Sequence, residues 1–325
     1  MTQTDMEPNE DRWLTPQPSR ELTVPQVGQN RILVEMIETV LATAREIAPA
    51  NIDLDQLVRE GKRLQSGGGL KPENIQAFKL FYQAATAGHS EAQFLVGKCY
   101  NLGRGVEPDE AQYLSWLRKS ADSGFAKAQI GLWDATKDPA EAAIWLRKAA
   151  TQGSHDAQYW LCGLYQRGEG VEQDDEEAVR WLRKAAMQGN PGAQYNLGLC
   201  YAEGQGVPQD DAEAVKWWRK SAVQWSHFGL YELGISYSHG RGVPRNLVDG
   251  YKWLRLAIEY HKRFRQVEGE VSEEEEAALT GAVAVEALMS PSEIEAGLKA
   301  CREFGLLAWL GPAKDARVPF KERVQ

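Results

Sequence analysis

Residues 193–207 read AQYNLGLCYAEGQGV, and three similar stretches lie elsewhere in the chain. They start at Ala92 (AQFLVGKCYNLGRGV), Ala157 (AQYWLCGLYQRGEGV) and Gly229 (GLYELGISYSHGRGV). The starts at 157, 193 and 229 are 36 residues apart. Self-similarity at a fixed period is typical of a protein built from stacked structural repeats.

The second half of each repeat carries its own motif, W-[LW]-R-K-[AS]-A, in four of the copies. This motif also identifies a shortened copy at 128–156, while a degenerate copy at 56–91 keeps mainly the glycines. We therefore predict six repeats between residues 56 and 264. Their bounds are 56–91, 92–127, 128–156, 157–192, 193–228 and 229–264.

Each repeat is expected to fold as two helices joined by a turn. Counting from the first residue of a repeat, positions 1, 5 and 9 (Ala157, Leu161 and Tyr165 in the fourth repeat) lie on one helical stripe. Glycines at positions 12 and 14 end the first helix. An Asp or Asn begins the second helix, and the polar residue three positions later completes a capping-box pattern. These N-cap residues are Asp109, Asp138, Asp174, Asp210 and Asn246. The second helix carries a Trp at position 25 and ends at a glycine.

The pattern A-x-x-x-L-G-x-x-Y-x-x-G-x-G-V, followed by an alanine-rich helix with W-x-R-K-A-A and a closing glycine, resembles the SEL-1-like repeat family. That family is similar to the tetratricopeptide repeats, and the resemblance covers residues 56–264. It implies an all-α fold, a right-handed α/α solenoid of helix pairs with helical caps. It also implies an adaptor that presents a concave groove to a protein or peptide.

The sequence outside the repeats predicts flanking caps and tails. We expect a mobile tail at 1–28 and a helical cap at 29–55. At the other end, Ser272 and then Ser290 are N-cap signals for two further helices, so we expect a helical cap at 265–310 and a tail at 311–325.

The formal charge of −9 is concentrated in the flanks. Residues 56–265 hold 24 acidic and 27 basic side chains, so the repeats are nearly neutral. This balance argues against a nucleic-acid partner held by a broad basic face. No apolar run approaches the roughly 18 residues that a membrane span needs. We therefore expect neither a nucleic acid nor a membrane as partner.

The cysteines indicate where the protein functions. Cys99, Cys162 and Cys200 lie on first helices, and no cysteine occupies the second helix of the same repeat. Secreted, helicobacter-type members of the SEL-1-like family carry paired cysteines that bridge the two helices. Their absence here predicts free thiols and a cytoplasmic location, and argues against the penicillin-binding activity claimed for that branch.

No motif for catalysis or metal binding stands out. The five histidines show no H-x-x-x-H spacing, and the chain has no C-x-x-C, no G-x-x-x-x-G-K-[ST] and no G-x-S-x-G. The recurrent G-x-G-V follows a helix and is interpreted as a turn, not a phosphate-binding loop. We expect no metal, no cofactor and no enzymatic activity.

The face of the first helices opposite the core stripe is the candidate binding surface. Positions 3, 7 and 10 cluster about 160° from that stripe at 100° per residue. Position 3 is mostly aromatic, and positions 10 and 11 are mostly polar, which is a combination suited to peptide binding. The candidates are Phe94, Asn101, Tyr159, Gln166, Arg167, Tyr195, Glu203, Tyr231, Ser238 and His239. The alternative is that the aromatic residues pack against the helices of the next repeat.

Three tryptophans break the repeat pattern. Trp133 lies where the short repeat should have a glycine, and Trp218 replaces a leucine. Trp225 replaces the closing glycine, a position that favours a left-handed backbone. Either the second helix runs on and the turn is rebuilt, or Trp225 is displayed to a partner; we include it among the candidate binding residues.

The Arg-Lys pairs of the second helices allow two interpretations. They are residues 118–119, 147–148, 183–184 and 219–220. Near a helix C-terminus such cations favour the helix dipole and pair with acids on neighbouring turns. Alternatively, they form a basic stripe for phosphate or acidic peptides.

The sequence thus predicts a non-enzymatic adaptor or regulator that binds a protein or peptide, with an immunity or chaperone-type role as one form. We expect a monomer. Two alternatives stay open. One is a β-lactam hydrolase of the cysteine-rich branch. The other is a self-associating scaffold, in which the acidic segment 266–300 docks on the basic pairs of a second copy.

Overall fold

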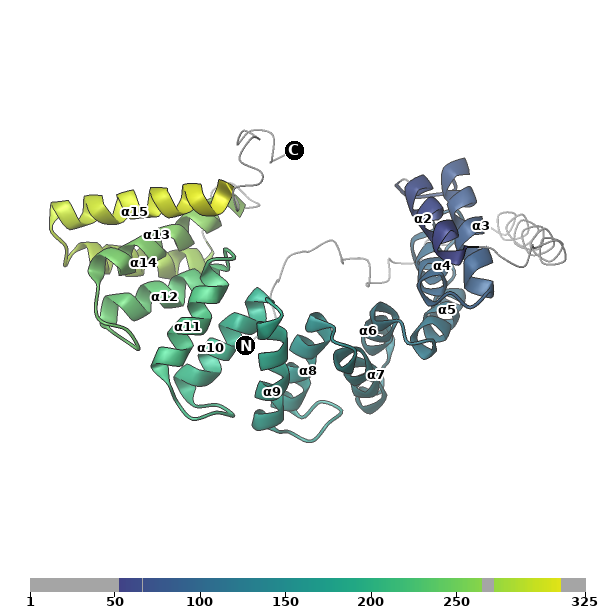
Figure 1. Ribbon diagram of the computed structural model, residues 1–325, viewed down its shortest axis with the longest axis horizontal. Coiled ribbons are helices and arrows are strands. Elements are labelled where there is room, and N and C mark those ends of the chain that lie inside the picture. Colours follow the sequence, from purple (N-terminus) through teal and green to yellow (C-terminus); the bar gives the residue numbers. More distant parts are fainter. Residues whose placement is uncertain (1–52, 66, 265–271, 311–325) are drawn as a thin grey trace. The chain divides into compact units, whose positions relative to one another are not determined.

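The computed structural model describes residues 53–65, 67–264 and 272–310 of the 325-residue chain. All regular secondary structure in these ranges is α-helix (Figure 1), as predicted. The first helices of the six pairs are α2 (Leu54–Leu64), α4 (Ser90–Leu102), α6 (Ala126–Ala135), α8 (His155–Arg167), α10 (Pro191–Glu203) and α12 (His227–His239). The second helices are α3 (Pro72–Thr86), α5 (Glu110–Asp122), α7 (Pro139–Thr151), α9 (Asp175–Met187), α11 (Asp211–Ala222) and α13 (Leu247–Phe264). Two further helices follow, α14 (Glu273–Glu286) and α15 (Pro291–Leu310). The predicted tails, and the predicted cap up to residue 52, lie outside the described residues.

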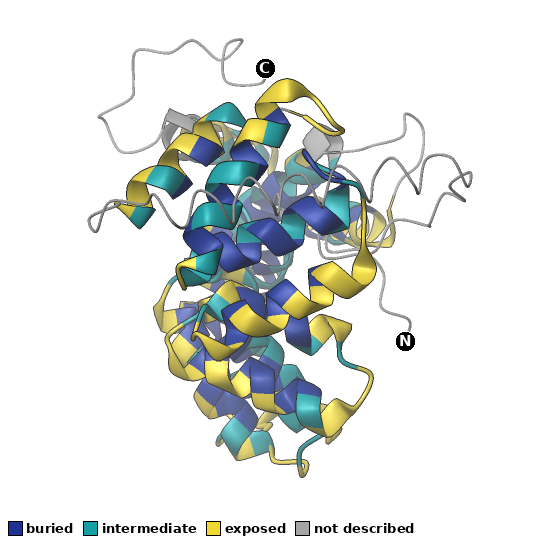
Figure 2. Cartoon of the chain, turned by 90° about the vertical axis from the view of Figure 1, so that its right-hand side faces the viewer, coloured by how far each residue is buried: buried dark blue, intermediate teal, exposed yellow. Residues whose placement is uncertain are grey.

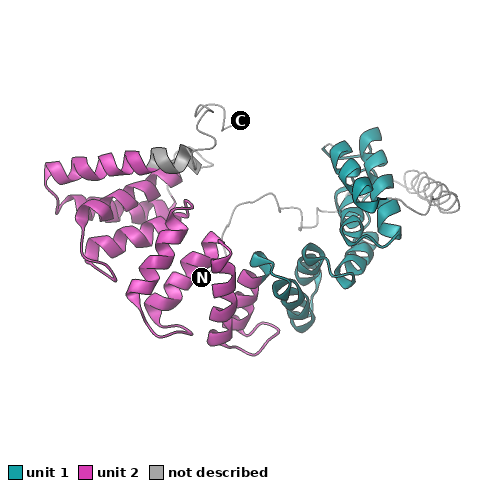
Figure 3. Ribbon diagram, in the orientation of Figure 1, with its two compact units in different colours: residues 1–157 teal, residues 158–325 magenta. Residues whose placement is uncertain are grey.

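The chain divides into two compact units, residues 1–157 and 158–325 (Figure 3). In the first unit each helix packs against the next one along the chain, from α2 to α7. In the second unit the same order runs from α9 to α13, and both α14 and α15 pack on α13. Sequential packing of helix pairs is the arrangement of an α/α solenoid, because each repeat buries its apolar face only against its neighbours.

Two left-handed glycines shape the turn inside each full-length repeat. In the fifth repeat Gly204 and Gly206 have φ angles of +72° and +67°. The second glycine also lies directly against the preceding repeat: a Cβ atom on Gly206 would be 2.2 Å from the carbonyl oxygen of Asp175. One repeat later, a Cβ atom on Gly242 would be 2.1 Å from the carbonyl oxygen of Asp211. Glycine is therefore needed here both for the backbone conformation and for the close contact between repeats.

The predicted N-caps are present, but the capping box is not formed as expected. The side chain of Asp174 accepts a hydrogen bond from the backbone N–H of Glu177 at 2.9 Å, and Asp210 does the same with Glu213 at 3.0 Å. In a capping box the N–H of the cap residue would bind the side chain three residues later. Instead, the N–H of Asp174 donates to the carbonyl of Tyr165 at 3.0 Å. The same bond recurs in the other full-length repeats, so the start of the second helix is tied to the end of the first.

Buried residues lie on both helices of the pairs (Figure 2). They are mainly alanine and leucine from both helices, and tryptophan from the second. The position-25 tryptophans are all buried, at 4–8% exposure: Trp116, Trp145, Trp181, Trp217 and Trp253. The alanines let the helices approach closely, and the large indole rings fill the remaining space between repeats.

Trp225 does not rebuild the turn, contrary to the first alternative predicted for it. Helix α11 ends at Ala222, and Trp225 itself adopts the left-handed conformation, with φ +62°. Its N–H donates to the carbonyl of Ala222 at 3.0 Å, just as the N–H of Gly189 donates to that of Ala186 at 3.1 Å one repeat earlier. The turn is therefore unchanged, and the tryptophan carries the backbone cost that glycine avoids.

The other two unexpected tryptophans serve the core. Trp218 is 1% exposed and lies over Gly198, where a Cβ atom would be 2.4 Å from the indole Nε1. Trp133 is partly buried and packs against the core of the first unit. In this short repeat α6 ends at Ala135 and α7 begins at Pro139, so the two-glycine turn is replaced by a three-residue link.

Helix α15 is attached to the second unit by aromatic rings. Phe304 lies between Trp253, at 4.8 Å between ring centroids, and Trp225, at 6.2 Å. The hydroxyl of Tyr251 donates to Glu286 of α14 at 2.8 Å. The described part of the acidic C-terminal segment thus packs on its own chain.

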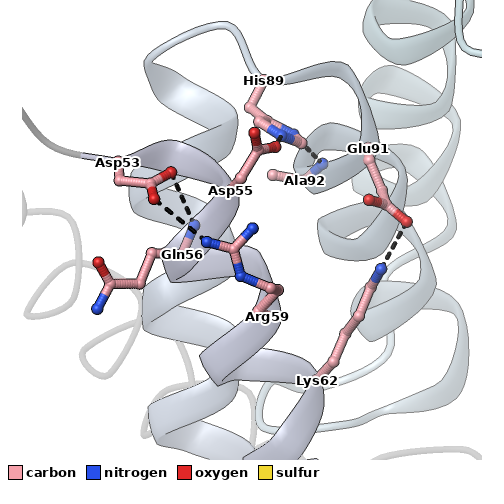
Figure 4. Close-up of polar contacts among 8 residues, drawn as sticks. All are labelled: Asp53, Asp55, Gln56, Arg59, Lys62, His89, Glu91 and Ala92. Carbon is pink, nitrogen blue, oxygen red and sulfur yellow. Dashed lines mark hydrogen bonds and ion pairs between the residues drawn. The ribbon is translucent and has the colours of Figure 1, made fainter.

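Charged side chains connect α2 to α4 at the start of the first unit (Figure 4). Lys62 pairs with Glu91 at 2.7 Å, and His89 Nε2 lies 2.8 Å from Asp55. His89 is also the N-cap of α4, because its Nδ1 accepts a hydrogen bond from the N–H of Ala92 at 3.1 Å. Since Nδ1 is the acceptor, Nε2 carries the proton and donates it to Asp55. One histidine side chain therefore caps one helix and binds another.

Candidate functional site

The predicted candidate face carries its residues at positions 3, 10 and 11 of the first helices. Its predicted residues are divided between the two units. Phe94 and Asn101 lie on α4 in the first unit. The others lie in the second unit, on α8, α10 and α12 and, for Trp225, directly after α11. Within the second unit the same position thus recurs on three successive first helices.

The position-3 aromatic residues contact the next first helix or the residue just before it. Phe94 is 4% exposed, and its ring centroid is 5.3 Å from that of Phe125. Tyr195 stacks on Phe228 of α12 at 5.0 Å, with an interplanar angle of 19°. These contacts agree in part with the alternative prediction, that the aromatic residues pack against the next repeat. Tyr159, Tyr195 and Tyr231 nevertheless keep part of their surface exposed, whereas Phe94 does not.

The tyrosine hydroxyls lie in a partly desolvated environment. The Asn196 amide donates a hydrogen bond to the hydroxyl of Tyr159 at 3.0 Å. Burial, together with the carboxylates of Glu232 and Glu203, raises the pKa of Tyr195 to about 12. Burial also raises the pKa of Tyr159. These hydroxyls stay protonated and act as hydrogen-bonding groups.

The polar residues at positions 10 and 11 differ in accessibility. Arg167, Glu203 and His239 are exposed at position 11. Asn101 and Gln166, at position 10, are partly buried. Ser238 is 4% exposed, and its hydroxyl donates to the carbonyl of Gly234 at 2.7 Å. Position 11 therefore supplies the exposed polar groups among the predicted binding residues.

Arg167 and His239 have local partners. Arg167 makes two hydrogen bonds to Glu169, at 2.8 and 2.9 Å, and this interaction raises the pKa of the guanidinium. The Nδ1 of His239 lies 3.0 Å from the carbonyl oxygen of Ile235. A bound partner would compete with the Arg167–Glu169 pair, which is exposed and therefore weak.

Trp225 is partly buried rather than displayed. Its ring packs against Phe304 of α15 and against the core of the second unit. Its place among the binding residues stays a prediction, and a smaller exposed surface is available there than the sequence suggests.

Three residues beside this face do not follow from the repeat positions that predicted it, namely Asn196, Phe228 and Glu232. Asn196 and Glu232 occupy position 4 of the fifth and sixth repeats, and both are partly buried. Phe228 precedes the sixth repeat and receives the ring of Tyr195. The available signal was that position 4 lies only one residue from position 3, at the edge of the same face.

The Arg-Lys pairs of the second helices contact mainly aromatic rings. Lys148, Lys184 and Lys220 lie 3.7–3.8 Å from the centroid of the tryptophan three residues earlier. Arg183 donates to the hydroxyl of Tyr201 at 2.8 Å, and Arg219 donates to that of Tyr237. Arg118 pairs with an acid, Glu141, at 2.8 Å, but this acid lies on α7 of the next repeat and not on a neighbouring turn of the same helix. These cations are largely engaged in cation–π contacts along the second helices.

The cysteines have the properties of core residues. Cys99, Cys162 and Cys200 are free and buried, and burial raises their pKa values to about 12, 12 and 11. A thiol with such a pKa stays protonated, and the thiolate is the reactive form. Among the described residues, no group of three or more His, Cys, Asp or Glu side chains has a metal-binding arrangement. No helix in the described ranges is long and apolar enough to cross a membrane.

Comparison with known families agrees with this architecture. The family model described as the Sel1 repeat matches residues 61–89, 90–125, 129–154, 155–190, 191–222 and 227–259, more than half of the chain. A comparison with curated proteins found no match.

Several solved structures resemble the chain. A Sel1 repeat protein from Oxalobacter formigenes is 26% identical, with a TM-score of 0.57, and the match covers 71% of this chain and 97% of that one. The protein c5321 of uropathogenic Escherichia coli, described as a protective antigen with an SLR fold, is 24% identical, with a TM-score of 0.49 over 82% of this chain. This chain spans 63% of the length of c5321. The immunity protein Pa5087 of Pseudomonas aeruginosa is 19% identical, with a TM-score of 0.38 over 68% of this chain and 90% of its own.

Proposed function

Because this chain belongs to the Sel1 repeat family, we propose that it is a non-enzymatic adaptor or regulator that binds a protein or peptide through the candidate face. One observation carries the proposal. In the second unit α8, α10 and α12 present a partly exposed tyrosine at the same position, each followed by an exposed polar residue at position 11. Rigid aromatic groups beside adaptable polar groups are the usual components of a protein-binding surface.

The chemistry of the described residues supports a binding role over a catalytic one. The repeat cysteines are protonated core thiols, and the cations of the second helices are engaged with aromatic rings. Four free thiols also fit a cytoplasmic location. An immunity or chaperone-type role is one specific form of this proposal, and the identity of the captured partner distinguishes it from the others.

Affinity capture with position-11 variants tests the proposal. The variant is Arg167→Ala/Glu203→Ala/His239→Ala in the full chain. All three side chains are exposed, so their loss should leave folding intact. We expect the main partner captured from native lysate by the wild type to be lost or strongly reduced with this variant. Far-UV circular dichroism and the unfolding midpoint verify that it is folded.

A matched control removes three exposed side chains from second helices. The control is Glu176→Ala/Arg180→Ala/Lys216→Ala, which breaks surface ion pairs of small energetic value. It should capture the partner as the wild type does. Equal capture by the folded position-11 variant, or selective loss with the control, would contradict binding at the candidate face.

A further inference from the structure

Glu232 is a partly buried carboxylate at the edge of the candidate face in the second unit. It occupies position 4 of the sixth repeat, on α12 and one turn after Phe228, whose ring stacks on Tyr195 of α10. Glu203, at the end of α10, is the second carboxylate close to Tyr195, and the charges of both act on the tyrosine hydroxyl. We call Tyr195, Glu203, Phe228 and Glu232 the tyrosine–carboxylate surface.

These two carboxylates differ from three other glutamates of the second unit. Glu169, Glu177 and Glu213 each bind a cation of their own chain, at 2.6–2.8 Å. Within the described ranges, neither Glu203 nor Glu232 has an ion pair or a side-chain hydrogen bond. The cation whose charge acts on Glu232 is Arg241, which is already bound to Asp211 at 2.9 Å and to the carbonyl of Ala202 at 3.2 Å.

An unpaired, partly buried carboxylate is unfavourable. Burial and the negative charge of Glu203 raise the pKa of Glu232, and Arg241 offsets this only in part. Burial removes part of the hydration of a carboxylate, and a cation placed between the two carboxylates would offset this loss. A neutral or acidic group would not offset it. The adjacent stacked rings of Tyr195 and Phe228 offer an apolar and π-rich wall, suited to a guanidinium or to the methylene stem of a lysine.

We propose that the tyrosine–carboxylate surface receives a basic side chain, an arginine or a lysine, of a protein segment. This inference rests on the proposed function and specifies the chemistry of the partner. The charge of the surface selects the occupant, because a basic segment is complementary to Glu203 and Glu232. The repeats as a whole are nearly neutral, so the negative charge of Glu203 and Glu232 is a local feature of this surface.

Selection from a random peptide library displayed on phage, with the full chain immobilised, tests the inference. We expect peptides selected by the wild type to be enriched in arginine and lysine over the unselected library. A selected peptide, synthesised and titrated in solution, should bind Glu203→Gln/Glu232→Gln about tenfold more weakly or worse. Tenfold corresponds to about 1.4 kcal/mol, in the range of one desolvated charge pair.

A charge-matched variant and a single variant complete the experiment. Glu172→Gln/Glu176→Gln removes two negative charges from exposed positions of the same unit and should bind within twofold of the wild type. Glu203→Gln alone alters only an exposed residue, so it should fold. It should weaken binding, and it takes the place of the double variant if that protein does not fold.

Selected peptides without basic enrichment, or equal binding by wild type and folded Glu203→Gln/Glu232→Gln, would overturn the inference while the proposed function stands. An equal loss with the charge-matched variant would also overturn it, since net charge alone would then explain binding. Failure of the wild type to enrich any peptide counts against both proposals.

Discussion

Gly198 shows how one residue type can have different roles at equivalent places in a repeat. A Cβ atom on Gly198 would lie 2.4–2.5 Å from two atoms of the buried Trp218 ring. Overpacking of this kind typically costs 1–3 kcal/mol, against about 1 kcal/mol gained from the helix propensity of alanine. We expect Gly198→Ala to lower the free energy of unfolding by about 1–2 kcal/mol, measured by urea denaturation.

Gly97 is the matched control at the corresponding position of the second repeat. A Cβ atom there would be 3.4 Å from its nearest neighbour, the carbonyl oxygen of Tyr113, which is an ordinary contact. Gly97→Ala should therefore leave stability unchanged or raise it by up to about 1 kcal/mol. If Gly198→Ala is as stable as Gly97→Ala, then Trp218 does not pack as described.

Trp225 combines an unfavourable backbone with a favourable ring contact. Its left-handed φ costs roughly 1–2 kcal/mol, and its ring contacts Phe304 of α15. Trp225→Gly should remove the energetic cost of the left-handed backbone and also remove the ring contact with Phe304. We expect a double-mutant cycle with Phe304→Ala, followed by urea unfolding, to give a coupling energy of about 0.5–1.5 kcal/mol. Additive effects of the two substitutions would show that the rings do not stabilise each other.

At the scale of the helix, local signals were predictable and contacts between repeats were not. Asp174 and Gly204 determine where helices begin and end through bonds to residues close in sequence, so the sequence indicated the helix pairs correctly. The N–H of Asp174 bonds to Tyr165, across the intervening turn, and a local capping rule could not anticipate this. Likewise, the contact between Tyr195 and Phe228 depends on the rotation between successive repeats, which the sequence does not specify. The candidate face could therefore be placed from sequence, but the exposure of its residues could not.

The contacts among α12, α13 and α14 should depend on pH. His227 at the start of α12 lies 5.0 Å, between ring centroids, from His261 of α13. Burial, with the charge of His261, lowers the pKa of His227 to about 4, although Glu274 of α14 acts in the opposite direction. Below about pH 6.5, the ordinary histidine pKa, the unfolded chain binds a proton that the folded chain excludes. This residue's contribution to stability therefore falls as the pH falls from about 6.5 to 4.

Urea unfolding across this pH range tests the expectation. Carboxylates also titrate there, so the informative quantity is the difference between variants. His227→Gln should show a smaller loss of unfolding free energy between pH 6.5 and 4 than the wild type. The exposed His239→Gln serves as control and should keep the wild-type slope. Identical slopes for all three proteins would contradict the role of His227.

At the scale of the whole molecule, sequential packing predicts that damage stays local. In each unit a helix packs against its neighbours along the chain, so a strained repeat destabilises mainly the repeats beside it. For Gly198→Ala, we therefore expect amide hydrogen exchange, followed by mass spectrometry, to accelerate in α9–α12 of the second unit. Peptides from α3–α5 of the first unit should exchange at wild-type rates, because local openings there do not involve Gly198. Gly97→Ala, measured in parallel, should show no such acceleration. A uniform acceleration over both units with Gly198→Ala would mean that the chain opens as one cooperative body, which nearest-neighbour packing alone does not allow.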